Sequence, residues 1–130
     1  MKAKNPVSWF EIYVNDMDRA KKFYEEVLHV QLSDMPMPHT VEEEMKMVSF
    51  PMEIDGPGAA GALVKMVDFK AGGGGSTIVY FDSDDCAIEE TRIEEAGGKV
   101  HQSKESIGEH GFIVLAFDTE GNIFGVHSSK

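Results

Sequence analysis

The order of strand and helix patterns occurs twice along this chain, and that repeat constrains the fold more than any other feature. Alternating apolar residues predict a strand over Val7–Val14, and apolar residues at helical spacing predict a helix over Asp18–Leu28. The same pair of patterns returns at Ser76–Phe81 and Cys86–Ala96. The strands predicted after the helices are Val30–Met35, Met45–Met52, Gly61–Asp68, Lys99–Ser106, Gly111–Asp118 and Asn122–Ser128. We therefore expect an α+β fold with two βαβββ modules.

The glycine-rich segment Lys70–Gly75 (KAGGGG) separates the two halves and is expected to be a flexible connection. A chain of 130 residues favours one compact domain over two. A solenoid would normally need at least three units, so two copies do not indicate one. We predict a single domain over residues 1–130, with modules at about 6–69 and 75–130.

Charge and composition exclude several classes of partner. The chain has 23 acidic and 12 basic side chains, for a formal charge of −11, and such a surface repels nucleic acid and anionic lipid. No apolar run could span a bilayer, and the first residues lack the apolar stretch of a secretory signal. Cys86 is the only cysteine, and its apolar helix position predicts a buried structural thiol. Together these features predict a cytoplasmic protein without nucleic-acid or membrane partners.

Four segments of the chain resemble a known family. Trp9–Ala20 (WFEIYVNDMDRA) resembles the opening of vicinal oxygen chelate proteins, and Ala96–Val100 and Phe117–Asn122 resemble their second half. The superfamily includes glyoxalase I, bleomycin-resistance proteins and extradiol dioxygenases. The closing segment Asn122–Ser128 resembles a bacterial glyoxalase-related subgroup. This resemblance implies two modules that form a cupped half-barrel sheet around a cavity, and it implies a homodimer.

The resemblance also implies one divalent ion, held by His, Gln or Glu on the first and fourth strands of each module. The matching positions are Trp9, Ser76 and Gly125, and the strand Gly61–Lys65 offers no acid at the fourth. A metal site needs converging oxygen, nitrogen or sulfur donors, which these residues do not supply. We therefore expect no metal and no other cofactor. The alternative is a displaced site built from Glu11 and His127.

Strand alternation separates residues that pack under a helix from residues that face the cavity. In the first strand, Phe10, Ile12 and Val14 are expected to pack under the helix. The cavity-facing set is Trp9, Glu11, Tyr13, Ser76, Ile78, Tyr80, Ile123, Gly125 and His127. From this set we select Trp9, Tyr13 and Ser76 as ligand-binding residues, because aromatic surface and hydroxyls suit a planar ligand. Any single aromatic could equally be ordinary core lining.

Glu11 is the most informative of the candidate catalytic residues. A carboxylate facing an apolar cavity is costly unless it is paired, so a general base or a ligand anchor is one interpretation. The other is a solvated side chain near the mouth, or one paired with Lys65 or Arg92. His127 is an acid/base partner of Glu11 or a surface histidine on a terminal strand. Tyr80 is the second candidate proton donor.

These residues predict a metal-free cavity that binds a small uncharged or cationic molecule. Acid/base turnover by Glu11 with His127 or Tyr80 would make the protein a lyase or isomerase, and the resemblance relates it to lactoylglutathione lyase. A second hypothesis is a sequestering protein of the bleomycin-resistance kind, which suits a charge of −11. A third is a metal-dependent lyase or dioxygenase with displaced ligands.

Overall fold

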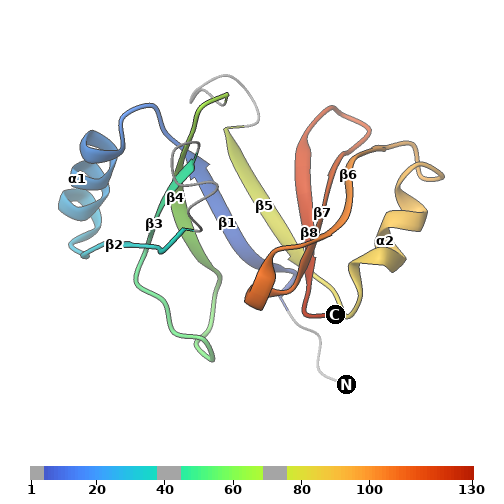
Figure 1. The fold of residues 1–130 in the computed structure, drawn as a ribbon, viewed down its shortest axis with the longest axis horizontal. Helices are drawn as coiled ribbons and strands as arrows, with labels where there is room; N and C mark the ends of the chain where they lie inside the picture. The colour runs from blue at the N-terminus through green and yellow to red at the C-terminus, as the bar shows by residue number, and fades with distance from the viewer. Residues whose placement is uncertain (1–4, 38–44, 69–75) are drawn as a thin grey trace. The chain divides into compact units, whose positions relative to one another are not determined.

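A computed structural model describes residues 5–37, 45–68 and 76–130, and its elements repeat in the predicted order (Figure 1). The elements are β1 (Val7–Tyr13), α1 (Met17–Leu28), β2 (Ser33–Asp34), β3 (Met45–Ser49), β4 (Ala60–Met66), β5 (Thr77–Asp82), α2 (Cys86–Ile93), β6 (Lys99–Ser106), the 3-10 turn η1 (Gly108–His110), β7 (Phe112–Phe117) and β8 (Ile123–Ser128). The α+β class and the doubled βαβββ order are confirmed. The predicted connection Lys70–Gly75 lies outside the described residues.

Several predicted elements are longer than the structure has them, as where the strand predicted over Met45–Met52 ends at Ser49, and two of the differences have a local cause. The strand predicted over Val30–Met35 is reduced to Ser33–Asp34, because the backbone N–H of Leu32 donates to the Glu25 carboxylate of α1 at 2.8 Å. The helix predicted to reach Ala96 ends at Ile93, and the chain turns through Gly97, whose φ of +103° suits glycine. In both places a local hydrogen bond or turn replaces the regular element.

The chain divides into two compact units, and each can be described by itself. The first unit contains residues 10–77, and its strand order is β2-β3-β4-β1. Val48 of β3 pairs with Leu63 of β4 in an antiparallel register, and both are buried under α1 together with Val14 and Met17. Ile12 packs against the same cluster. The predicted helix-facing side of β1 is therefore confirmed at Ile12 and Val14.

The second unit contains residues 5–9 and 78–130, with the strand order β5-β8-β7-β6. The start of β1 belongs to it because Pro6 and Ser8 bond to β5, through Asp82 N to Pro6 O at 2.9 Å and Ser8 Oγ to Tyr80 O at 3.4 Å. β5 and β8 run parallel, and β7 is antiparallel to both β8 and β6. The core cluster of this second unit consists of Cys86, Ile93, Val114, Ala116 and Val126. The predicted burial of Cys86 is confirmed.

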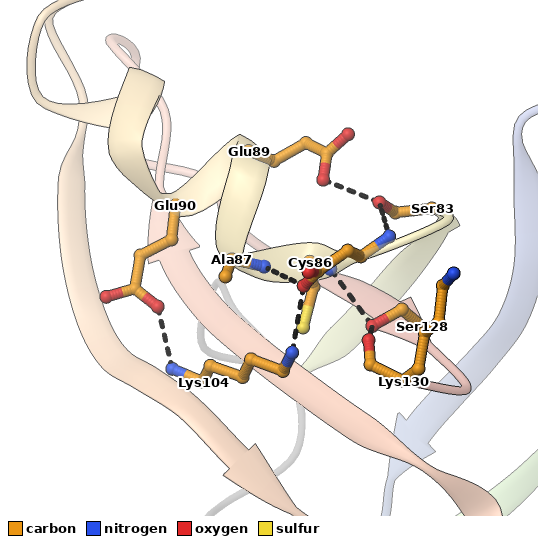
Figure 2. A network of polar contacts seen from close by, with 9 residues as sticks. Ser83, Cys86, Ala87, Glu89, Glu90, Lys104, Ser128 and Lys130 are labelled. Carbon is orange, nitrogen blue, oxygen red and sulfur yellow. Dashed lines mark hydrogen bonds and ion pairs between the residues drawn. The ribbon is translucent and has the colours of Figure 1, made fainter.

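Polar contacts hold the start of α2 in place (Figure 2). The buried Ser128 hydroxyl accepts from the backbone N–H of Cys86 at 2.9 Å and donates to the Lys130 carbonyl at 2.9 Å. Lys104 Nζ lies 2.8 Å from Asp85 Oδ1, at the N-cap of the helix. This hydrogen bond holds the pKa of Asp85 below its ordinary value and the pKa of Lys104 above its own. The short helix α2 is thereby held in place by the side chains of Lys104 on β6 and Ser128 on β8.

Candidate functional site

Glu11 and Tyr13 form a hydrogen-bonded pair in the first unit. They lie two residues apart on β1, so their side chains share one face of the strand. The Tyr13 hydroxyl donates to Glu11 Oε1 at 2.9 Å. Tyr13 is 8% exposed and Glu11 is half-buried. A charge-assisted bond of this kind orients the carboxylate and keeps a proton within reach of it.

A cavity of about 440 Å³ lies where β1 leads into α1 in the first unit. Two residues predicted to bind ligand, Tyr13 and Ser76, line it, and the backbone N–H of Tyr13 donates to Ser76 O at 2.7 Å. The other lining residues are Ile12, Val14, Asn15, Asp16, Arg19, Ala20, Phe23 and Tyr24. A volume of this size is within the usual range for small-molecule sites, about 300–1,000 Å³. Ile12 and Val14 line it from the helix side of β1, whereas the side chain of Tyr13 shares the opposite face of the strand with Glu11.

Three cavity residues on α1 escaped the sequence prediction: Arg19, Phe23 and Tyr24. Phe23 is 55% exposed, and its ring meets that of Tyr24 edge-on at 5.1 Å. The signal was present, because Phe23 lies one position away from the stripe of Met17, Ala20 and Tyr24 that packs on the core. A helix that turns an aromatic ring and a guanidinium away from its core stripe presents them to a neighbouring surface or ligand.

The other predicted site residues, Trp9, Tyr80 and His127, lie in the second unit. Tyr80 pairs with Gly125 across β5 and β8, and its ring covers that glycine. His127 is paired with Ile113 in the sheet, and its Nε2 lies 2.5 Å from the His110 carbonyl of η1. A donating Nε2 leaves Nδ1 of a neutral ring as the acceptor. Because Glu11 and His127 belong to different units, the catalytic pair predicted for them stays a prediction.

The residues at the implied metal positions do not fit a divalent ion. Trp9 and Ser76 offer an indole and a hydroxyl, and Gly125 offers no side chain. A Cβ built on Gly125 would lie 2.3 Å from Tyr80 Cδ2, so a carboxylate there would have to displace the ring. Within residues 5–37, 45–68 and 76–130, no group of three or more His, Cys, Asp or Glu side chains could hold a metal ion. The displaced site on Glu11 and His127 thus has no third protein ligand of these types in the described part of the chain.

Solved structures with this fold include two methylmalonyl-CoA epimerases. The Streptomyces coelicolor enzyme (Q60A), in complex with 2-nitronate-propionyl-CoA, has a TM-score of 0.68 at 14% identity, covering 98% of this chain and 99% of that chain. The Mycobacterium tuberculosis enzyme has a TM-score of 0.66 at 13% identity, covering 100% and 93%. A hypothetical protein from Bacillus halodurans has a TM-score of 0.68 at 9% identity, covering 95% and 94%. At these identities the likeness shows a shared fold.

Sequence comparison carries the assignment further. No curated protein sequence matches the chain. No helix in the described part of the structure is long and apolar enough to cross a membrane. The family model named Glyoxalase/Bleomycin resistance protein/Dioxygenase superfamily matches residues 7–126, which is nearly the whole chain. With the doubled βαβββ order confirmed as well, the chain belongs to the glyoxalase/bleomycin resistance protein/dioxygenase superfamily.

Proposed function

We propose that this protein binds a small organic molecule on the face of β1 that carries Glu11 and Tyr13 and moves a proton on it, as an isomerase or lyase that uses side-chain acid/base groups. The observation that carries the proposal is the hydrogen bond that the Tyr13 hydroxyl donates to Glu11 Oε1 at 2.9 Å, on the face of β1 opposite α1. A base and a proton carrier in hydrogen-bond contact are the arrangement that general acid/base catalysis requires.

In the proposed step, Tyr13 relays the proton and Glu11 is the base. The Tyr13 oxygen takes a proton from the ligand as its own proton passes to the Glu11 carboxylate. The electron pair left on the ligand moves onto an adjacent carbonyl oxygen. Return of the proton to another position completes an isomerisation, and loss of a leaving group completes an elimination. Neither course requires an external oxidant or reductant.

The chemistry of the step defines the ligand that we propose. A carbonyl group makes a neighbouring C–H acidic and takes up the electron pair that the departing proton leaves behind. The ligand therefore carries a carbonyl group. The epimerases with this fold support a proton-transfer reaction by analogy of fold alone.

Hydrogen–deuterium exchange into the ligand tests the proposal directly. Methylmalonyl-CoA and a set of small ketones and hydroxy ketones are incubated with the protein in D₂O, and exchange is followed by proton NMR. We expect Glu11→Gln and Tyr13→Phe to slow exchange by about 10²–10⁴-fold while binding, measured by calorimetry, is kept. Tyr24→Phe is the matched control, because it removes a tyrosine hydroxyl from the helix side of the same unit.

Two outcomes would contradict this function. Unchanged exchange in both Glu11→Gln and Tyr13→Phe would remove the pair from the reaction. Binding without exchange by the unaltered protein would favour a sequestering role of the bleomycin-resistance kind, for which the charge of −11 is the supporting observation.

A homodimer in the cytoplasm is the setting that we propose for this activity. The family resemblance supports the dimer, and the single cysteine, Cys86, is consistent with a reducing compartment. Light scattering coupled to size-exclusion chromatography tests the dimer, with a mass near 14.3 kDa contradicting it.

A further inference from the structure

We propose a second ligand site, in the second unit beside α2, that binds a small hydrophobic amine in its cationic form. A cavity of about 500 Å³ lies there, and all of its lining residues belong to this unit. Its lining includes Phe124 and Val126 of β8, which face α2, whereas Gly125 and His127 face the other side of the strand. The site is therefore separate from the cavity beside α1 and does not depend on the proposed acid/base function.

Two phenylalanine rings form the apolar wall of this cavity. Phe81 and Phe124 line it, and their rings meet edge-on with centroids 6.1 Å apart. Phe117 also lines it, but its ring lies against His101 on the face of β7 opposite Ala116. Phe81 is 38% exposed, although it lies on a strand of the sheet. Adjacent rings left open to solvent offer a surface for an apolar or aromatic body of a ligand.

The shortness of α2 explains why these rings are not covered. The helix ends at Ile93, and the chain that follows lines the cavity with Ala96 and Gly98, two of the smallest residues. A Cβ on Gly98 would lie 2.5 Å from the carbonyl oxygen of Phe117. The turn after the helix is thus pressed against β7 at a point where only glycine fits, and it leaves the space above the rings open.

The polar groups around the rings select a positive charge. Two acidic residues of the lining, Glu89 and Asp118, stand against one basic residue, Arg92. Asp82 also belongs to the lining, but it pairs with His127, whose side of the sheet faces away from α2. The carboxylate of Asp118 accepts from the backbone N–H and the side-chain amide of Asn122, at 2.9 and 3.1 Å, and the backbone bond is the main cause that lowers its pKa. It is therefore ionised at neutral pH, and an anionic ligand would meet it unfavourably.

Aromatic rings and carboxylates attract the same class of ligand. The face of a phenylalanine ring attracts an ammonium group, and a nearby carboxylate adds to that attraction. The charge of −11 on the whole chain raises the local concentration of cations near the surface. These features point to a molecule with one ammonium group on a short chain and an apolar, preferably aromatic, body.

The polar network of Figure 2 ties α2 to the strands beside the cavity. Glu89 accepts from the Ser83 hydroxyl at 2.6 Å, and Glu90 accepts from the backbone N–H of Lys104 at 2.8 Å. These bonds tie α2 to the end of β5 and to β6, so the helix cannot close onto the rings without breaking them. A preformed site lowers the cost of ordering on binding.

A matched set of three probes tests the proposal: 2-phenylethylamine, 2-phenylethanol and 3-phenylpropionate, followed by two-dimensional amide NMR of the full chain. We expect the amine to shift resonances of α2, β7 and β8, with an affinity about tenfold above that of the alcohol, and the carboxylate to produce no shifts there. Equal binding of the amine and the alcohol would overturn the charge argument. Shifts confined to the first unit would overturn the site.

Variants complete the test. Phe81→Ala removes the exposed ring, and we expect it to weaken amine binding by about 3- to 30-fold. Phe23→Ala is the matched control, since Phe23 is an exposed ring of the first unit and should leave amine binding unchanged. Glu89→Gln should weaken the amine but not the alcohol. The proposal would be contradicted if Phe23→Ala weakened the binding of the amine and Phe81→Ala did not. This outcome is independent of whether Glu11 and Tyr13 transfer a proton.

Discussion

The two helices occupy equivalent places in the two modules, but different interactions hold them. α1 has 12 residues and packs Met17, Ala20 and Tyr24 on a cluster of buried apolar side chains. α2 has 8 residues, and alongside its apolar contacts the start of the helix is fixed by Ser128 and by the pair of Asp85 and Lys104. The longer helix thus has a full apolar stripe, whereas the shorter one adds polar bonds to its apolar contacts.

This difference has a consequence for the two cavities. The cavity beside α1 is lined by residues near the start of its helix, including Arg19 and Phe23. The cavity beside α2 is lined by residues near the end of its helix and by the turn that follows, including Arg92 and Ala96. One topology therefore places a cavity at opposite ends of its two helices. The helix length and the residues around each end decide what each cavity can bind.

The largest expected effect tests whether α1 is held by one apolar face. Met17 is buried in the core cluster, and Met17→Ala should lower the free energy of unfolding by about 2–5 kcal/mol. Val27 is 57% exposed on the same helix, and Val27→Ala should change it by less than about 0.5 kcal/mol. Urea unfolding followed by circular dichroism measures both. Similar losses in the two variants would contradict the one-sided packing.

The next effect tests the polar anchoring of α2. Ser128→Ala removes the acceptor of the buried Cys86 N–H, and an unsatisfied buried donor costs about 1–3 kcal/mol. Ser129→Ala, one residue further on and exposed, is the control and should have little effect. Amide exchange of α2 provides the specific measurement, because its first-turn protection should fall in Ser128→Ala. An unaltered exchange rate would show that the apolar contacts of α2 suffice.

A smaller effect compares a glycine of each unit. A Cβ at Gly61 would lie 2.4 Å from Phe10 Cε1, and one at Gly125 would lie 2.3 Å from Tyr80 Cδ2. In both places the obstacle is a side-chain ring that can shift, so Gly61→Ala and Gly125→Ala should each cost about 1–2 kcal/mol. Replacing Tyr80 by leucine should relieve the cost at Gly125 and leave that at Gly61 unchanged. Additive losses of unfolding free energy in the double variant of Gly125→Ala and Tyr80→Leu would disprove the contact between position 125 and the Tyr80 ring.

The fold was predictable because its signals are local and repeated. Alternation placed Ile12 and Val14 on the helix side of β1, and caps and spacing located both helices. The short extent of β2 was not predictable, because it depends on a hydrogen bond between two elements. The backbone N–H of Leu32 donates to the carboxylate of Glu25 on α1 and so does not pair within the sheet. A helix ending at Ile93 rather than Ala96 likewise depends on the turn at Gly97, which places Gly98 against β7.

The candidate site was predictable only in part. Alternation selects Glu11 and Tyr13 for one face of β1, but their hydrogen bond requires rotamers that no pattern encodes. Ser76 reaches the cavity through a backbone bond to Tyr13 across 63 residues of chain, as the positions 13 and 76 show. Phe81 and Phe124 have the pattern of ordinary apolar strand residues. They line an open cavity because α2 ends at Ile93 and does not cover them. Local periodicity cannot report what a neighbouring element fails to cover.

The smallest expected effect is the pH dependence of the Asp85–Lys104 pair. The bond to Lys104 lowers the pKa of Asp85 from 3.8, so its contribution to stability is complete above pH 3.8 and is lost as the pH falls through the lowered pKa. The same bond raises the pKa of Lys104 from 10.5, so that contribution is complete below pH 10.5 and is lost as the pH rises through the raised pKa.

Asp85→Asn separates this charge from the helix cap, because asparagine keeps an acceptor for the N–H of Ala87. We expect the variant to flatten the loss of stability at both pH limits and to reduce its sensitivity to salt, since the pair is open to solvent. Asp16→Asn makes the same change at the cap of α1, where Asp16 accepts from Arg19 N at 3.0 Å, and should leave the alkaline limit unchanged. If both variants behave alike in unfolding curves taken from pH 2 to 11, the ion pair does not distinguish the two helices. The difference between the modules would then rest on Ser128 alone.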